Sequence, residues 1–113
     1  MKEITAYIRP DRVDDVILAL EEQGVPGMTI IDVYALAKWT DPRRTVISSK
    51  YIEKYGKIVK LELICKAEEV ETMIDIISSA ARTGYPGDGK IFISDIYDAV
   101  SIRTGNRGYE AIQ

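Results

Sequence analysis

The stretch IVKLELICKAEEVETMIDIISSAARTGYPGDGKIFISDIY, residues 58–97, decides the fold of this chain. Residues 58–66 are rich in apolar and β-branched side chains and predict a strand. Residues 68–82 predict an amphipathic helix, because apolar side chains recur there at helical spacing. A glycine-rich turn follows, and residues 90–97 predict another strand. The apolar stripe of the predicted helix consists of Val70, Met73, Ile74, Ile77 and Ala81.

The first part of the chain predicts a second unit of the same kind. Residues 3–9 alternate around apolar side chains, as a half-buried strand does, and Pro10 ends this strand. Asp11 is placed to cap a helix that extends to Gly24. Residues 28–37 are a β-branched apolar run typical of a strand. The apolar side of this helix consists of Val13, Val16, Ile17 and Leu20.

Two β-α-β halves predict an α+β domain that spans residues 1–113, with the ferredoxin-like βαββαβ fold. In this fold an antiparallel four-stranded sheet carries both helices on one face. The other face needs cover that a chain of 113 residues has little left to supply, so we expect oligomerisation. Residues 38–57 show no firm periodicity and predict a long loop, which is either functional or an excursion without a role. A short extended piece is expected at residues 100–104.

Composition removes several classes of function. The net charge of −3 argues against nucleic acid as a partner, because phosphate binding needs a surplus of Lys and Arg. The chain has no histidine, which excludes Ser-His and Cys-His nucleophile pairs and argues against an enzyme. The single cysteine, Cys65, is expected to be a buried apolar residue rather than a reactive thiol. No apolar run suggests membrane insertion or a signal peptide, so a cytoplasmic protein is expected.

The turn TGYPGDGKIF, residues 83–92, is the strongest candidate binding element. Three glycines and a proline in seven residues allow backbone N–H groups to converge, and Lys90 adds a positive charge beside them. Such a turn suits a phosphate group. It also suits a plain connection between a helix and a strand, because Pro-Gly and Asp-Gly are common turn formers.

The chain resembles the PII signal-transduction family over nearly its whole length. The resemblance is strongest at residues 83–96, TGYPGDGKIFISDI, and at residues 102–112, IRTGNRGYEAI. Residues 1–4, 8–10 and 24–29 are similar as well. The resemblance implies a homotrimer of ferredoxin-like subunits with an adenine nucleotide in each cleft between neighbours. It also implies that residues 38–57 form a T-loop that docks on transporters, enzymes or transcription regulators.

By position, the resemblance assigns roles to individual residues. The phosphates would be held by Gly87, Asp88, Gly89 and Lys90, with help from Arg103. Apart from the resemblance, Lys38 is the candidate for a contact between the nucleotide and the T-loop. The adenosine would be surrounded by Gly27, Met28, Thr29, Glu62, Leu63 and Ile64. Independently of the resemblance, aromatic side chains on a loop favour contact with protein, which makes Trp39, Tyr51 and Tyr55 candidate partner-binding residues together with Arg43 and Arg44; the alternative is that the loop packs on its own trimer. Tyr51 and Ser49 occupy positions that are modified in some members, although the residues around them do not match the family's loop motif.

Four departures from the family pattern concern the ligand. Ala35-Leu36-Ala37-Lys38 replaces a glycine-rich segment. Trp39 replaces the glutamine that helps to hold Mg²⁺ and 2-oxoglutarate, and indole cannot coordinate a hard cation. Ile58 replaces the lysine that pairs with 2-oxoglutarate, unless neighbouring Lys57 takes its place, and Ser101 replaces a phosphate-facing arginine. We therefore expect ADP or AMP as well as ATP, and doubt a role for Mg²⁺ or 2-oxoglutarate.

The sequence favours a PII-like regulator that binds an adenine nucleotide and controls a partner, with a membrane transporter as the expected target. One alternative is a trimeric interaction module that has lost the nucleotide, which the departures from the family pattern at Ala37 and Ser101 suggest. A slow ATP hydrolase on the same fold is the other alternative, and the lack of histidine weakens it.

Overall fold

The computed structural model describes residues 1–36, 46–47 and 54–113 of the chain. Its strands are β1 (Lys2–Ile8), β2 (Thr29–Leu36), β3 (Val46–Ile47), β4 (Lys54–Cys65) and β5 (Lys90–Asp95). Its helices are α1 (Val13–Glu22) and α2 (Val70–Ala81), and short 3₁₀ turns lie at Pro10–Arg12, Ala67–Glu69 and Gly108–Ile112.

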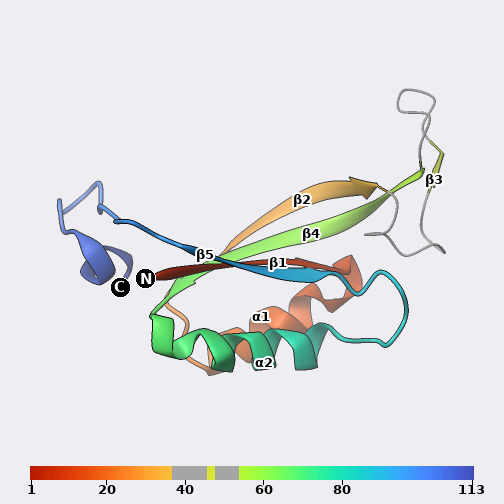
Figure 1. Cartoon of the computed structure of the whole chain (residues 1–113), viewed down its shortest axis with the longest axis horizontal. Helices are drawn as coiled ribbons and strands as arrows, with labels where there is room; N and C mark the ends of the chain where they lie inside the picture. Colours follow the sequence, from red (N-terminus) through yellow and green to blue (C-terminus); the bar gives the residue numbers. More distant parts are fainter. Residues whose placement is uncertain (37–45, 48–53) are drawn as a thin grey trace.

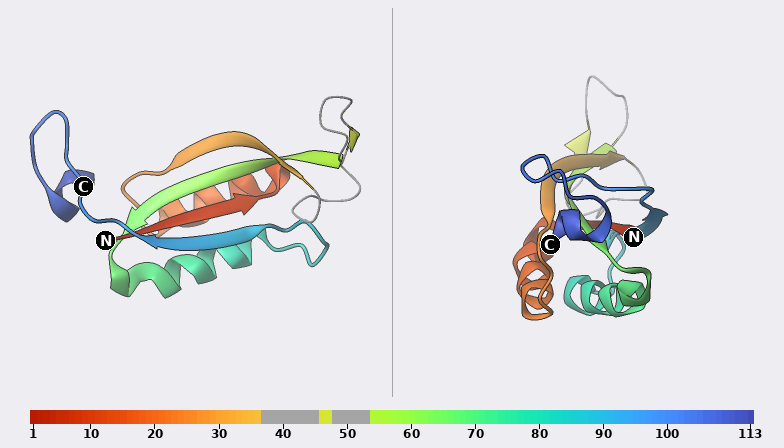
Figure 2. Two further views of the ribbon diagram at one scale, coloured as in Figure 1. Left: turned by 45° about the horizontal axis from the view of Figure 1, so that its top comes forward. Right: turned by 90° about the vertical axis from the view of Figure 1, so that its left-hand side faces the viewer.

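The sheet has the order β2-β4-β1-β5, and every pair of neighbours in it is antiparallel. Both helices lie on the same face of the sheet, as Figure 1 and the end-on view in Figure 2 show. This arrangement confirms the predicted ferredoxin-like βαββαβ fold. The short strand β3, which the sequence analysis did not predict, pairs with the first residues of β4.

The core lies between the helices and the inner face of the two central strands. Alternate residues of β1 and β4 are buried there, as the predicted two-residue period requires. The helices contribute one stripe each, so their 3.6-residue period is confirmed as well. The fully buried side chains with the largest volumes are Ile4, Val16, Leu20, Leu61 and Ile77.

The predicted end of the T-loop at residue 57 is wrong. Strand β4 begins at Lys54, four residues earlier than expected, because its first residues pair with the end of β2. Tyr55 lies opposite Leu36 and Gly56 lies opposite Ala35. Backbone hydrogen bonding to a distant strand decides the conformation here, and local periodicity does not reveal such pairing.

The predicted helix starts are also shifted. Helix α1 begins at Val13 and is preceded by Arg12, whereas Asp11, the expected cap, lies inside the 3₁₀ turn Pro10–Arg12. Helix α2 begins at Val70 after a second 3₁₀ turn, Ala67–Glu69. Both helices therefore begin with a tightened first turn, which the helical periodicity alone does not distinguish from α-helix.

The C-terminal region differs most from expectation. Strand β5 ends at Asp95, and the extended piece expected at residues 100–104 is confirmed only at Val100, which forms an isolated antiparallel bridge with Arg107, whereas residues 102–104 form a turn. The turn is closed by a hydrogen bond from the Ser101 N–H to the Asn106 carbonyl at 2.9 Å. The Asp98 carboxylate braces it by accepting from the Arg107 guanidinium and from the Gly108 N–H. The chain then ends in the 3₁₀ turn Gly108–Ile112.

The face of the sheet opposite the helices carries exposed apolar side chains. Phe92 of β5 is 47% exposed and Ile31 of β2 is 41% exposed. Their register with β1 and β4 places both on this open face. The Tyr7 ring meets the Phe92 ring edge to face, with 6.0 Å between their centroids. The open face thus carries exposed apolar side chains among polar ones such as Thr5, Lys60 and Lys90, and the described part of the chain leaves it accessible.

Within residues 1–36, 46–47 and 54–113, no helix has the length and apolar character that a bilayer crossing requires.

Two leucines test the position of the core. Leu61 is 0% exposed and Leu18, on the outer side of α1, is 57% exposed. We expect Leu61→Ala to lower the free energy of unfolding by about 2–5 kcal/mol, because it removes buried methyl groups and leaves a cavity. Leu18→Ala should change it by less than about 0.5 kcal/mol. Urea unfolding followed by circular dichroism measures both, and equal effects would contradict the described core.

Candidate functional site

The glycine turn lies against the backbone of β1. Gly84, Gly87 and Gly89 all have positive φ angles, of 91°, 98° and 109°. A Cβ atom at Gly89 would lie 1.6 Å from the Tyr7 carbonyl oxygen, so no other residue fits there. Glycine at this position therefore allows the turn to pack directly on the first strand.

The Asp88 carboxylate holds the two ends of the turn together. Its Oδ2 accepts from the backbone N–H groups of Thr83 and Gly84 at 2.9 and 2.8 Å. Its Oδ1 accepts from the Thr83 hydroxyl and from the Arg9 Nε. Partial burial disfavours the charged form, but these hydrogen bonds outweigh it and hold the pKa of Asp88 well below its ordinary value. Asp88 is thus a structural anion of the turn, and its carboxylate is occupied.

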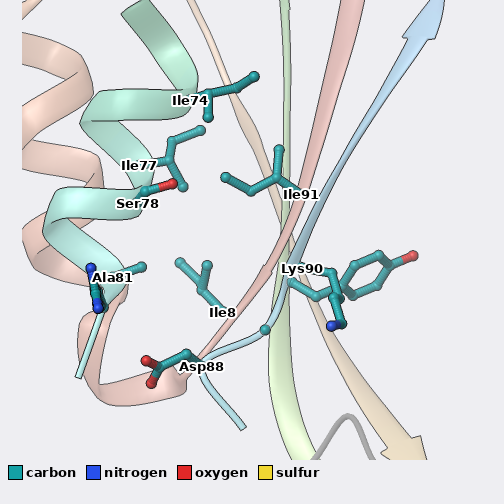
Figure 3. A pocket seen from close by; sticks show the side chains of 11 residues that line it. Ile8, Ile74, Ile77, Ser78, Ala81, Asp88, Lys90 and Ile91 are labelled. Atoms are coloured by element: carbon teal, nitrogen blue, oxygen red, sulfur yellow. The ribbon is translucent and has the colours of Figure 1, made fainter. Parts of the chain in front are cut away.

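Lys90 is the cation of the turn that faces outward. It is the first residue of β5 and pairs with Tyr7. Since Ile8 and Ile91 next to this pair point toward α2, Lys90 projects from the open face (Figure 3). Asp88 and Lys90 therefore lie on different sides of the sheet, and the carboxylate does not neutralise the lysine.

A cavity of about 490 Å³ separates the turn from α2. Figure 3 shows that the side chains of Ile8, Ile74, Ile77 and Ile91 point into it. Asp88, Gly89 and Lys90 also border it, whereas Gly87 is not among its lining residues. Its walls are mostly apolar, so the cavity itself offers little to a phosphate group.

The six residues assigned to adenosine lie together. They line a second cavity, of about 430 Å³, at the edge formed by β2 and the end of β4. Thr29 is opposite Glu62 in this pair of strands. The Glu62 carboxylate is 3.9 Å from the Lys60 Nζ, and Leu63 belongs to the core. The complete lining is Glu3, Pro26, Gly27, Met28, Thr29, Glu62, Leu63, Ile64 and Ile112.

Within one chain, the two predicted halves of the site are apart. The adenosine half borders the edge strand β2, and the phosphate half borders the opposite edge strand β5. Strands β4 and β1 lie between them, which corresponds to about 14 Å across three strand spacings. Arg103 is exposed on the C-terminal turn, at the end of the molecule opposite to the glycine turn (Figure 1). A ligand that contacts all of these groups needs more than one copy of the chain.

The remaining predicted residues fall into two groups. Lys57 forms an ion pair with Asp32 at 3.4 Å, and both residues lie on the helix side of the sheet. Ile58 is buried on the other side, so Lys57 does not take its place. The structure describes only the backbone of Tyr55, and the following lie outside the described residues: Ala37, Lys38, Trp39, Arg43, Arg44, Ser49 and Tyr51.

Sequence reasoning missed two sets of residues. Arg9 binds the glycine turn from the end of β1, and its only sequence signal is a charged residue at a strand end before a proline. Tyr7 faces the same side as Lys90. Glu3, Pro26 and Ile112 complete the adenosine cavity, and Ile112 reaches it only through the unpredicted C-terminal 3₁₀ turn.

The chain is similar to known proteins over nearly its whole length. The family model described as Nitrogen regulatory protein P-II matches residues 1–106. The chain is 41% identical over 112 residues to Nitrogen regulatory protein P-II 1 of Methanothermobacter thermautotrophicus, covering 99% of this chain and 97% of the relative. It is 38% identical to the proteins named Nitrogen regulatory protein P-II of Microchaete diplosiphon and of Synechocystis sp., covering 99% of this chain and 100% of each relative.

Two glycines of the turn form a matched pair for mutation. Gly89→Ala would place a Cβ atom 1.6 Å from the Tyr7 carbonyl oxygen, whereas a Cβ atom at Gly84 would meet nothing within 4 Å. Both have positive φ, so Gly84→Ala should cost about 1 kcal/mol of unfolding free energy from backbone strain. Gly89→Ala should cost clearly more, about 3 kcal/mol, because β5 must move away from β1. Thermal and urea unfolding compare the two, and similar losses would contradict the close packing at Gly89.

The Asp88 carboxylate predicts how stability depends on pH. Its pKa in the folded chain is below the ordinary 3.8, so the unfolded chain takes up the proton more readily. The stabilisation by Asp88 is therefore complete above about pH 4 and is lost as the pH falls below that value. We expect Asp88→Asn to lower the unfolding free energy by about 1–3 kcal/mol at pH 7, and the gap from wild type to shrink at pH 3. Urea unfolding at both pH values measures this, with the exposed Asp75→Asn as control, and a gap that is constant with pH would contradict it.

Proposed function

Because this chain belongs to the nitrogen regulatory protein P-II family, we propose that it is a regulator that binds an adenine nucleotide between copies of itself. Members of this family are signalling regulators, and the chain is one of this type. The finer proposal is a cytoplasmic homotrimer. In it, each nucleotide lies between two neighbours, and nucleotide binding changes how the protein contacts a partner.

One observation carries the nucleotide proposal. The chain has an adenosine-sized cavity at one edge of its sheet and an amide-rich, cationic turn at the other edge. Each is half of a nucleotide site, and the two cannot meet within one chain. When the β2 edge of one copy lies beside the β5 edge of the next, the halves come together, and such a head-to-tail contact closes into a ring. The apolar side chains on the open face, such as Ile31 and Phe92, favour this association.

The chemistry of the two halves suits the two parts of a nucleotide. Met28 and Ile64 offer apolar surface to a base, and Thr29 and Glu62 offer hydrogen-bonding groups to it or to the ribose. At the turn, the N–H groups of Gly87 and Gly89 and the Lys90 ammonium attract phosphate oxygens. Arg103, exposed on the C-terminal turn, would add a second cation from the neighbouring copy.

The occupied carboxylate of Asp88 favours binding without a metal and without catalysis. A divalent cation at this turn would have to displace Arg9 and the amides that already hold both oxygens. A general base must be free to accept a proton, and Asp88 is engaged by four donors with a lowered pKa. We therefore propose that ADP, AMP or ATP binds as a regulatory ligand, and that hydrolysis is not the function.

The T-loop is the proposed output. Strands β2 and β4, which flank this segment in the sequence, pair with each other up to Leu36 and Tyr55 (Figure 1). With the corrected bounds, the T-loop comprises residues 37–53. We propose that it contacts a protein target through Trp39, Arg43, Arg44 and Tyr51, together with Tyr55 at the start of β4, and that the target is a membrane transporter. Aromatic and arginine side chains are the usual anchors of protein interfaces.

Calorimetric titration of the purified protein with ATP, ADP and AMP tests the nucleotide proposal. Each nucleotide is added with and without Mg²⁺ and 2-oxoglutarate, and sedimentation gives the oligomeric state. We expect Lys90→Gln to weaken ADP binding by about tenfold or more, because a charge-assisted contact contributes about 1.5–3 kcal/mol. Lys57→Gln is the matched control, since Lys57 is exposed on the helix side and pairs with Asp32.

The outcomes separate the candidate functions. Equal loss in the two lysine variants would place the phosphates elsewhere. A trimer that takes up none of the three nucleotides would reject the proposal in favour of a nucleotide-independent interaction module. Release of phosphate from ATP that Lys90→Gln abolishes would instead indicate a hydrolase.

A further inference from the structure

Arg9 is a buried cation, and apolar packing in the core does not account for its burial. It follows the last residue of β1 and is 4% exposed. Burying an isolated charge costs several kcal/mol, so such a residue must be well paired. Three of its side-chain hydrogen bonds lead to the glycine turn: Nε donates to the Asp88 Oδ1 at 2.8 Å, and Nη2 donates to the carbonyls of Pro86 and Tyr85 at 2.8 and 3.3 Å.

From these contacts we propose that Arg9 is a positioning residue for the phosphate half of the nucleotide site. It would orient the turn of residues 83–90 so that the protein distinguishes nucleotides that carry a diphosphate from those that carry none. This inference rests on the proposed nucleotide binding. It adds to that proposal the role of Arg9 in orienting the turn and the preference for a ligand with a diphosphate.

The first part of the mechanism is the polarity of a peptide group. In a trans peptide the carbonyl and the N–H point in opposite directions. The Pro86 carbonyl is turned toward Arg9, so the N–H of Gly87, in the same peptide group, points away from the buried guanidinium. Without Arg9, a glycine at a positive φ angle has little to prevent this peptide from flipping. A flipped peptide would present a carbonyl oxygen, which repels a phosphate, where the amide had been.

The second part is the charge inside the turn. A bare carboxylate beside a phosphate site would repel the ligand. Arg9 pairs with Asp88 and offsets its charge. Asp88 in turn takes the amides of Thr83 and Gly84, so the donors for a phosphate must come from the second half of the turn. Arg9 therefore removes a repulsion and directs the remaining donors at the same time.

The shape of the guanidinium matters as much as its charge. The planar guanidinium donates to three acceptors of the turn at once. They are the carbonyls of Tyr85 and Pro86 and the carboxylate of Asp88. A lysine ammonium carries the same charge but cannot reproduce this planar geometry. Arg9→Lys therefore keeps the neutralisation of Asp88 and loses the control of peptide orientation.

Arg12 supplies a matched control. It too is an arginine beside β1, and it donates through Nε and Nη2 to a backbone carbonyl, that of Ala80 in α2, at 3.0 and 2.6 Å. It also pairs with Asp15 at 3.2 Å. Removal of Arg12 tests the general cost of losing an arginine that braces a carbonyl, without touching the glycine turn.

The experiment measures affinity for ADP, AMP and adenosine by calorimetry on wild type, Arg9→Met, Arg9→Lys and Arg12→Met. We expect Arg9→Met to weaken ADP binding by about tenfold or more and adenosine binding by less than about twofold, because only ADP contacts the turn through its phosphates. Arg9→Lys should recover part of this loss and Arg12→Met should leave the ADP-to-adenosine ratio unchanged. If Arg9→Met does not fold, the inference is tested on Arg9→Lys. The measurements are then its affinities for ADP and adenosine and the NMR shift of the Gly87 amide on addition of ADP.

The results distinguish this inference from the proposed function. Equal weakening of ADP and adenosine in the Arg9 variants would show a general structural role and overturn the inference, as would ADP affinity equal to that of wild type. In either case, nucleotide binding by the wild type would still stand. A wild-type protein that binds neither ADP nor adenosine would reject both proposals together.

Discussion

Burial of a single face of the sheet holds this molecule together. The inner residues of β1 and β4 pack on α1 and α2, and this contact contains all of the most deeply buried side chains. Apolar burial of this kind is the dominant favourable term in folding. The two helices can cover only one face, so the other remains open with Ile31 and Phe92 exposed on it. The same constraint that makes the fold stable therefore leaves a surface suited to a second copy of the chain.

The candidate site follows from this one-sided architecture. Strand order places β2 and β5 at opposite edges, and each edge carries one group of site residues. Neither group alone resembles a complete ligand pocket. In a head-to-tail ring, each chain would present one group to each neighbour, so assembly and ligand binding would be coupled by geometry. A regulator benefits from such coupling, because a ligand held between copies can change their relative arrangement.

The glycine turn is fixed by contacts with the end of β1. Gly89 packs on the Tyr7 carbonyl, and the buried Arg9 binds both the Asp88 carboxylate and the carbonyls of the turn. These contacts lie on the inner side, and Lys90 projects from the outer side. Internal pairing of the Asp88 charge leaves Lys90 facing outward. A ligand site built in this way would be organised before a ligand arrives, which would reduce the entropy lost on binding.

The sequence alone determined the order of the two helices and the four main strands and the faces that the helices bury. Residue periods of 3.6 and 2 are local, so α1, α2, β1 and β5 could be predicted from their own side chains. The resemblance also indicated the six residues that the fold gathers in one cavity. Only the tertiary structure decided where β4 begins, how the C-terminal turn closes and which residue binds the glycine turn. The physical reason is that strand pairing, the Asp98–Arg107 contact and the Arg9–Asp88 pair join groups that only folding brings together. An arginine before a proline carries no sign of the carboxylate, 79 residues further along the chain, that it will meet.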